Sequence, residues 1–339
     1  PPRSTLFPYT TLFRSGSVSA TGGTPANHVV VCGNQAGPIT GARIDGFTIR
    51  GGRSVLISGV YHAGRGAGLY NFKSQPAVEN CTFTDNIAAV SGGAIANESF
   101  GANLAVASIV NCTFYSNTAS RSQDSSSNPV CGGGAIFNNN ADVTLRYCDV
   151  VNNAIGAGWA GALGANSAGV YNWDSSPNVN STVFWNNGGT ADPTDNMITE
   201  DPTVPADDAP VITNCHSTAV DPLFVAAGPE FYLQATSPLR DLGDPSNPAP
   251  TRDLPGSPRP QNTRVDIGAY EYVATAPNAI CKNLTLTLDA LNNAVLYATD
   301  VNNASVVAGG VWKMQIHEGA GSNVDSIAYN CAGVGSHTI

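Results

Sequence analysis

Arg146 and Asp149 are the residues whose types and spacing best fit acid–base chemistry. They lie three positions apart, and a guanidinium beside a carboxylate could bind an acidic sugar and move its proton. Such chemistry needs several charged groups gathered around one sugar. In related stretches of the chain, however, the position of Asp149 is taken by uncharged residues, namely Thr82, Thr113 and Val183. The sequence therefore offers Arg146 and Asp149 as low-ranking catalytic candidates and favours a protein without a catalytic centre.

Cysteine, histidine and acidic residues do not have the spacing of a metal site. The eight cysteines include no CxxC motif, which most zinc sites require, and the acidic residues near the C-terminal half lack a calcium-loop pattern. Three cysteines instead recur at equivalent places, which predicts a buried column of small apolar side chains. These are Cys81, Cys112 and Cys148. We expect no metal and no cofactor.

Several aromatic residues could stack on sugar rings. They flank the variable parts of the chain, where loops on a rigid scaffold commonly carry binding residues. The candidates are Tyr115, Trp159, Tyr171, Trp173 and Trp185. In the alternative interpretation, these rings only cover the outer face of a sheet, and the sequence leaves both interpretations open.

These candidates lie in or between the copies of a repeated phrase, apolar-x-x-Cys-x-apolar-x-x-Asn. Measured at the Cys position, six copies begin with Phe47 and continue 34, 31, 36, 34 and 33 residues apart, to Cys215. A period of this length is the signature of a repeat architecture. A second phrase, Gly/Ala-apolar-x-Asn, precedes four copies. Its apolar residues alternate as in short strands with one buried face.

Strands this short bury their apolar side only by stacking turn upon turn. The sequence therefore predicts a parallel β-solenoid with stacked inward columns. One column contains the three cysteines, and another contains Phe83, Phe114, Val150 and Phe184.

Asparagines end each copy of the two phrases. We expect their amides to bond from turn to turn as a ladder, and Asn also tolerates the left-handed backbone of a tight bend. The first set is Asn86, Asn117, Asn153 and Asn187, and the second is Asn71, Asn97, Asn138 and Asn172.

Two motif groups resemble known families. Gly92-Gly93-Ala94-Ile95 and Phe114-Tyr115-Ser116-Asn117 resemble the GGA[ILV] and FxxN motifs of polymorphic outer-membrane protein repeats. Three later motifs look like the choice-of-anchor Q domain of bacterial secreted proteins: 221–225 (DPLFV), 231–239 (FYLQATSPL) and 265–272 (VDIGAYEY). The resemblance implies an all-β, right-handed parallel β-helix on an exported protein.

The chain divides into four parts. Residues 5–15 (TLFPYTTLFRS) resemble a translated sequencing adaptor, so residues 1–15 are interpreted as an artefact. The β-helix is expected over 16–224, and 225–272 is expected to cap its open end, where an exposed strand edge would recruit other chains. Residues 273–339 resemble part of an HYR-type, immunoglobulin-like β-sandwich. That resemblance implies a Cys281–Cys331 pair, and we expect this domain to be incomplete.

Composition restricts the partners. The net charge is −10 and only three residues are lysine, which disfavours nucleic acid and anionic membranes. No apolar run is long enough to span a bilayer. We expect a monomeric scaffold at the bacterial cell surface or outside the cell, acting as an adhesin or structural module that binds a glycan or a surface protein. The alternative is a polysaccharide lyase or glycoside hydrolase acting on acidic polysaccharide.

Overall fold

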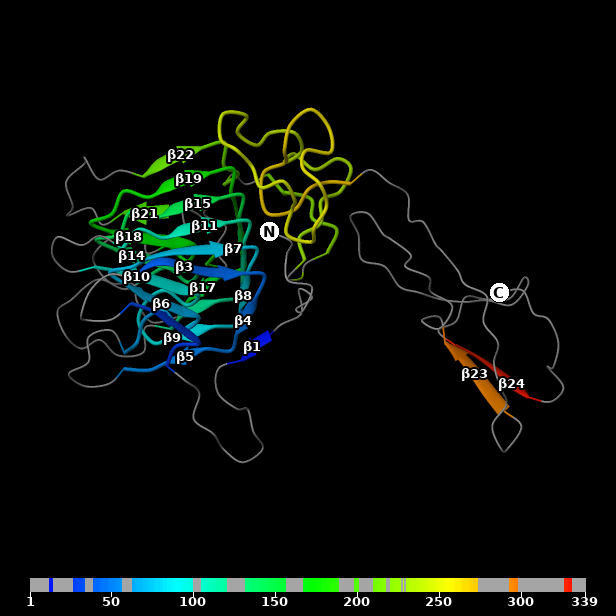
Figure 1. Ribbon diagram of the computed structural model, residues 1–339, viewed down its shortest axis with the longest axis horizontal. Coiled ribbons are helices and arrows are strands. Elements are labelled where there is room, and N and C mark those ends of the chain that lie inside the picture. Colours follow the sequence, from blue (N-terminus) through cyan, green and yellow to red (C-terminus); the bar gives the residue numbers. More distant parts are fainter. Residues whose placement is uncertain are drawn as a thin grey trace. The chain divides into compact units, whose positions relative to one another are not determined.

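The computed structural model shows a parallel β-helix of the right-handed type (Figure 1). It describes residues 12–14, 27–33, 39–56, 63–99, 105–120, 132–156, 167–188, 198–200, 210–217, 220–226, 228, 230–273, 293–297 and 326–330. The described residues contain no helix, and so none that could cross a membrane. The chain forms two compact units, Pro1–Glu271 and Tyr272–Ile339.

Four successive turns of the coil, beginning with β2, each contribute one strand to each of four parallel sheets, and further strands extend three of these sheets. In order along a turn, the first sheet contains β2 (Val30–Cys32), β6 (Leu69–Phe72), β10 (Ile95–Glu98), β14 (Ile136–Asn139), β18 (Val170–Trp173) and β21 (Ile198–Glu200). The second contains β3 (Thr40–Asp45), β7 (Gln75–Glu79), β11 (Ser108–Val110), β15 (Thr144–Arg146), β19 (Asn178–Asn180) and β22 (Val211–Thr213).

The third sheet contains β1 (Leu12–Arg14), β4 (Thr48–Arg50), β8 (Thr82–Thr84), β12 (Thr113–Tyr115), β16 (Asp149–Val151) and β20 (Val183–Trp185). The fourth contains β5 (Arg53–Ser54), β9 (Ile87–Ala88), β13 (Thr118–Ala119) and β17 (Ala154–Ile155). The outermost strand of the third sheet, β1, lies within the stretch that the sequence suggests is adaptor-derived.

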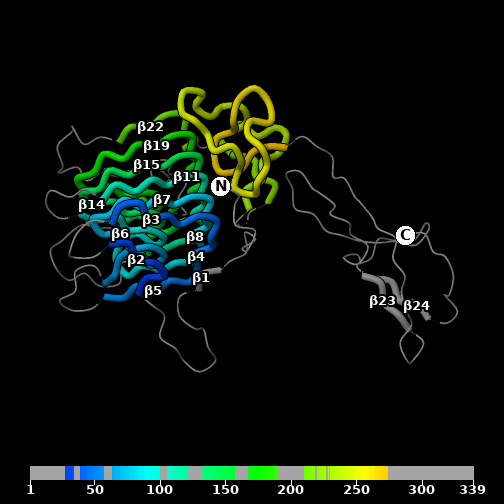
Figure 2. Tube along the Cα trace, viewed as in Figure 1, coloured from blue at the N-terminus to red at the C-terminus, as the bar shows by residue number. Residues whose placement is uncertain are grey.

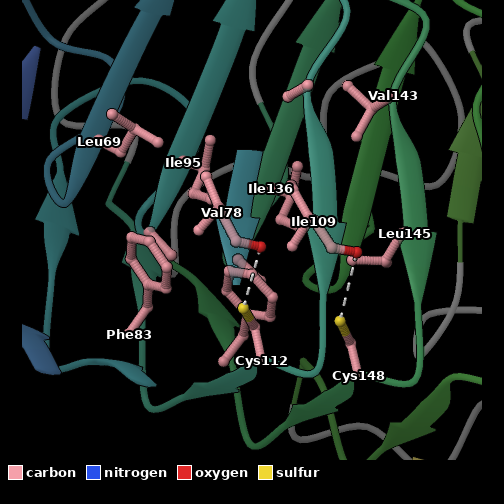
Figure 3. Close-up of a cluster of buried hydrophobic side chains, with 14 of the residues drawn as sticks. Leu69, Val78, Phe83, Ile95, Ile109, Cys112, Ile136, Val143, Leu145 and Cys148 are labelled. Carbon is pink, nitrogen blue, oxygen red and sulfur yellow. Dashed lines mark hydrogen bonds between the residues drawn. The ribbon is translucent and has the colours of Figure 1, made fainter. Parts of the chain in front are cut away.

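The strand register stacks equivalent residues directly on one another. Phe114 pairs with Phe83 on one side and Val150 on the other, and the Phe83 and Phe114 rings stack 5.1 Å apart. Figure 3 shows part of this core, in which the thiols of Cys112 and Cys148 donate to carbonyls of the preceding turn. The cysteines of this column are free thiols with no exposed surface.

Both asparagine sets form continuous ladders of buried amides. Asn86 donates to Asn117, Asn117 to Asn153 and Asn153 to Asn187, at 2.9–3.0 Å. The second ladder joins Asn71, Asn97, Asn138 and Asn172 at 2.8–2.9 Å.

The left-handed backbone at the first corner belongs to the residue before each ladder asparagine. The φ angles there are +50° to +55°, at Asp85, Ser116, Asn152 and Asn186. The expectation that the ladder asparagines themselves adopt this conformation was wrong at this corner. Their side chains are instead directed into the coil and accept main-chain N–H groups of the neighbouring turn.

Residues 220–271 form a lateral segment, drawn yellow in Figures 1 and 2, that lies on the flank of the coil. Its polar contacts reach three successive turns: Asn111 donates to Arg252, the Tyr147 hydroxyl to Asn247, and the Gly268 amide to Ser181. The sequence placed this segment over the open end of the coil. The outer face of the third sheet attracts it instead, because Val151 and the rings of Tyr115 and Trp185 point outward there and need cover.

The second unit is described only in part. Its strands β23 (Asn293–Tyr297) and β24 (Ser326–Asn330) pair antiparallel. Cys281 and Cys331, and thus the expected disulfide, lie outside the described residues.

Candidate ligand-binding groove

The outer face of the third sheet carries two columns of side chains that change character along the coil. One runs Thr48, Thr82, Thr113, Asp149 and Val183, and the other runs Arg50, Thr84, Tyr115, Val151 and Trp185. The last three members of the second column contact the apolar cluster formed with the lateral segment. The first two members of each column line an open groove.

This groove has a volume of about 310 Å³, which is at the lower end of the range for small-ligand sites. Its floor is Thr48, Arg50, Thr82 and Thr84, with Gly46, Phe47 and Asn80 at the adjoining corner. Its wall is built by the lateral segment from Glu230, Tyr232, Leu254, Pro255 and Tyr270. Hydroxyls on a flat floor beside aromatic rings can bind a sugar by hydrogen bonding and stacking at once.

Arg50 and Glu230 give the groove one positive and one negative charge. Arg50 pairs with Asp85 at 2.8 Å, and both side chains are about half exposed. An exposed ion pair of this kind contributes little to stability, so a ligand can replace Asp85 at low cost. Glu230 is an exposed residue of the wall.

The two tyrosines of the wall pack against each other. Their rings meet edge to face at 5.2 Å. Burial is the main cause that raises the pKa of Tyr232 and, more strongly, that of Tyr270. Both phenols are therefore neutral near pH 7, and Tyr232 presents a half-buried ring to the groove.

Arg146 and Asp149 contact the lateral segment and do not line the groove. The Arg146 guanidinium donates to Asn247 of the lateral segment at 2.7 Å, whereas Asp149 is 1% exposed beneath Gly268 and Ala269. Burial raises the pKa of Asp149 to about 7, against the opposing effects of the Ala269 amide and Arg259. The two residues lie on strands of different sheets, joined through the left-handed Tyr147, and neither lines the groove.

The aromatic candidates also lie apart from the groove. Tyr115 packs edge to face on Phe231 at 5.6 Å, and Trp185 joins the same covered cluster. Tyr171 and Trp173 lie on the outer face of the first sheet, where Tyr171 stacks with Phe137 at 6.0 Å. Trp159 lies outside the described residues. The four described rings thus pack in two clusters on the outer faces of the first and third sheets.

A buried ion pair on the first sheet, Arg65–Glu98, was not anticipated from the sequence. The two side chains are 4% and 0% exposed. Arg65 lies over the Phe137 ring at 5.2 Å, and Asn139 donates to Glu98 at 3.3 Å. Ala96, the small member of an otherwise mostly aromatic column, leaves space for this arginine. The pair anchors the turn around Arg65 and exposes no reactive group.

No group of three or more Asp, Glu, His or Cys side chains within the described ranges is arranged to hold a metal ion. Comparison with protein-family models, with curated proteins and with solved structures found no match. The chemistry of the groove therefore has to be argued from its own residues.

The sequence alone did not predict the groove, because its wall is formed by residues far along the chain from those of its floor. The floor had a visible signal, since threonine recurs at outward positions Thr48, Thr82 and Thr84. The wall had none, because 220–271 carries no repeat that indicates where it packs.

Proposed function

We propose that the protein is a secreted or cell-surface binding module without catalytic activity, and that its groove binds an extended glycan. The observation that carries this proposal is the composition of the groove, in which strand threonines and Arg50 form the floor and Tyr232 forms part of the wall. The β-helix holds the floor residues on a rigid surface, so little ordering of the floor is needed on binding.

The motif resemblances support export. The choice-of-anchor Q and HYR-type motifs are typical of bacterial surface proteins, and the low charge and amide-rich surface suit an extracellular scaffold. In this role the coil acts as a stiff adhesin or spacer, and the groove supplies the contact with a glycan of the cell surface or surroundings.

Cleavage of an acidic polysaccharide is the second candidate. It is favoured by the presence of Arg50 and Glu230 in one groove, which can hold a uronic acid and accept a proton. Arg50 and Glu230 thus replace Arg146 and Asp149 as the residues to test.

The experiment is a glycan array probed with the full chain, followed by calorimetric titration of the best ligand. Tyr232→Ala should weaken binding at least tenfold, because stacking rings dominate such contacts. Thr82→Val, which removes a hydroxyl at constant shape, should weaken it severalfold. Thr144→Val is the matched control, since Thr144 is a half-buried strand threonine of the second sheet.

The same ligands should be incubated with the chain and assayed for new reducing ends and unsaturated sugars. If the chain cleaves a glycan and Arg50→Ala abolishes this turnover, the proposal of a binding module is rejected in favour of an enzyme. Binding that Tyr232→Ala and Thr82→Val leave unchanged would remove the groove as the site.

A further inference from the structure

The groove wall is only as stable as the attachment of the lateral segment. The described residues of 220–271 form no regular strand or helix, and their backbone bonds are those of turns and of isolated bridges such as Phe224–Leu233 and Arg252–Pro258. The position of the segment therefore depends on its contacts with the coil. The apolar part is the cluster of Phe231, Leu254 and Tyr270 against the third sheet.

Asp149 lies in the middle of this attachment. Its carboxylate is covered by Gly268, where an added Cβ would overlap Asp149 Oδ1, and it accepts the Ala269 amide. Asp149 Oδ2 has no hydrogen-bond partner among the described residues. When the segment is detached, Asp149 becomes an ordinary exposed residue of an outer sheet face.

Arg259 is the arginine that lies among the buried acidic groups near Asp149. Arg259 pairs with Glu271 at 3.2 Å and donates to the Gly268 carbonyl at 2.8 Å. Asp253 accepts the Glu271 amide at 3.1 Å, and Asp266 raises the pKa of Glu271 by charge repulsion. Four buried acids surround this one arginine, namely Asp149, Asp253, Asp266 and Glu271. If all four were ionised, their charges together with that of Arg259 would sum to −3.

We propose that pH controls the attachment of the lateral segment to the coil, so that the segment is held at acidic pH and loosens as the pH rises through neutrality. Since the segment forms the wall of the proposed glycan groove, the consequence for ligand binding rests on the proposed function. The attachment itself does not.

The direction follows from the acids. Burial is the main cause that raises the pKa of Asp149 and of Glu271, each to about 7, and that of Asp253. The attached state thus holds protons that the detached state releases, and attachment is strongest near the ordinary carboxyl pKa of about 4 and weakens up to about pH 7.

One neighbouring group offsets part of this dependence. Burial lowers the pKa of His216, whose ring bonds the Val220 carbonyl at 2.9 Å, so its one proton opposes those bound by Asp149 and Glu271. The Arg259 guanidinium lies over the Tyr147 ring at 5.4 Å. Burial raises the pKa of the facing phenols, Tyr147, Tyr232 and Tyr270, so they stay neutral from pH 5 to 8. Glu230, close enough to raise the pKa of Tyr232 and Tyr270, adds further negative charge.

Hydrogen exchange of the full chain without any ligand, measured from pH 5.5 to 8 and corrected for intrinsic exchange rates, tests the proposal. The reporter is the Gly268 amide, which donates to Ser181 O at 2.9 Å. We expect its protection to fall at least tenfold across this range, while peptides covering β8 and β12 keep theirs. Protection of Gly268 that is independent of pH would overturn the proposal.

Asp149→Asn and Asp149→Thr both remove the ionisable carboxyl at the centre of the attachment. Threonine is the residue found at the equivalent position of the two preceding turns, Thr82 and Thr113. Each variant should flatten the profile, by up to tenfold per pH unit. Asp174→Asn is the control, an exposed acid in the turn after β18, and should keep the wild-type profile. If both Asp149 variants leave Gly268 unprotected even at pH 5.5, the pH dependence of the wild-type chain alone tests the proposal.

The two proposals can fail separately. Gly268 protection that does not change with pH, together with intact glycan binding, would reject pH control and keep the groove as the binding site. Protection that falls steeply with pH, without any glycan binding, would reject only the proposed glycan function.

Discussion

At the scale of single residues, the asparagine ladder is the most demanding feature of the coil. Each inner amide of the first ladder has donors and acceptors satisfied within the coil. Asn117, for example, donates to Asn153 and to the Phe83 carbonyl, and accepts from the amide and side chain of Asn86. Buried amides are costly when left unpaired, so one wrong residue disrupts the turn above and the turn below.

Asn117→Ala should therefore destabilise the coil by about 2 to 4 kcal/mol, because it leaves buried partners unsatisfied on two neighbouring turns. Urea unfolding followed by circular dichroism measures the change. Asn178→Ala, at an exposed position of β19, should stay within about 0.5 kcal/mol of the parent. Equal values for the two variants would mean that the ladder bonds do not stabilise the fold.

The residue pattern predicted the columns and ladders but not the site. Periodicity fixes which side chains point inward, since Cys112 and Phe114 fall in step with their copies. It says nothing about what covers the outward residues. Asp149 was a reasonable catalytic candidate as an outward acid, and became a buried contact only because a distant segment packs over it.

At the scale of elements, each strand is too short to be stable alone. Strands such as β12 contribute three residues, so their stability comes from the strands above and below. The central position of such a strand is then the most sensitive point of the coil.

Phe114→Asp should abolish cooperative folding, because the side chain at this position is fully buried and a charge there has no partner or water. Thermal unfolding followed in the far ultraviolet tests this expectation. Val106→Asp places the same charge at an exposed site just before β11 and should melt close to the parent. A parent-like transition in Phe114→Asp would show that the inward column is misassigned.

Phe231→Ala should detach the lateral segment and leave the coil intact. The ring is 1% exposed and touches Tyr115, Phe224 and Tyr270, and such truncations cost about 3 to 5 kcal/mol. Hydrogen exchange should rise in 240–271 and stay unchanged in β8. Phe72→Ala, at a half-buried ring on the first sheet, is the control and should leave 240–271 protected.

At the scale of the whole molecule, the coil is a one-dimensional stack in which each turn contacts mainly its neighbours. Its last strand, β22, leaves Val211 55% and Ile212 38% exposed, since the lateral segment covers a flank instead. The groove likewise exists because the lateral segment covers only part of the third sheet.

The turn-to-turn stacking also determines how the molecule would respond to being pulled. Equivalent asparagines on neighbouring turns are 31, 36 and 34 residues apart in the chain, and the main-chain bonds between the described strands of the coil join each turn to the turns beside it. Tension on the two ends would peel one turn at a time, each releasing roughly 100 to 130 Å of extended chain. A coil built in this way dissipates mechanical work in steps of nearly equal length and lengthens gradually under load.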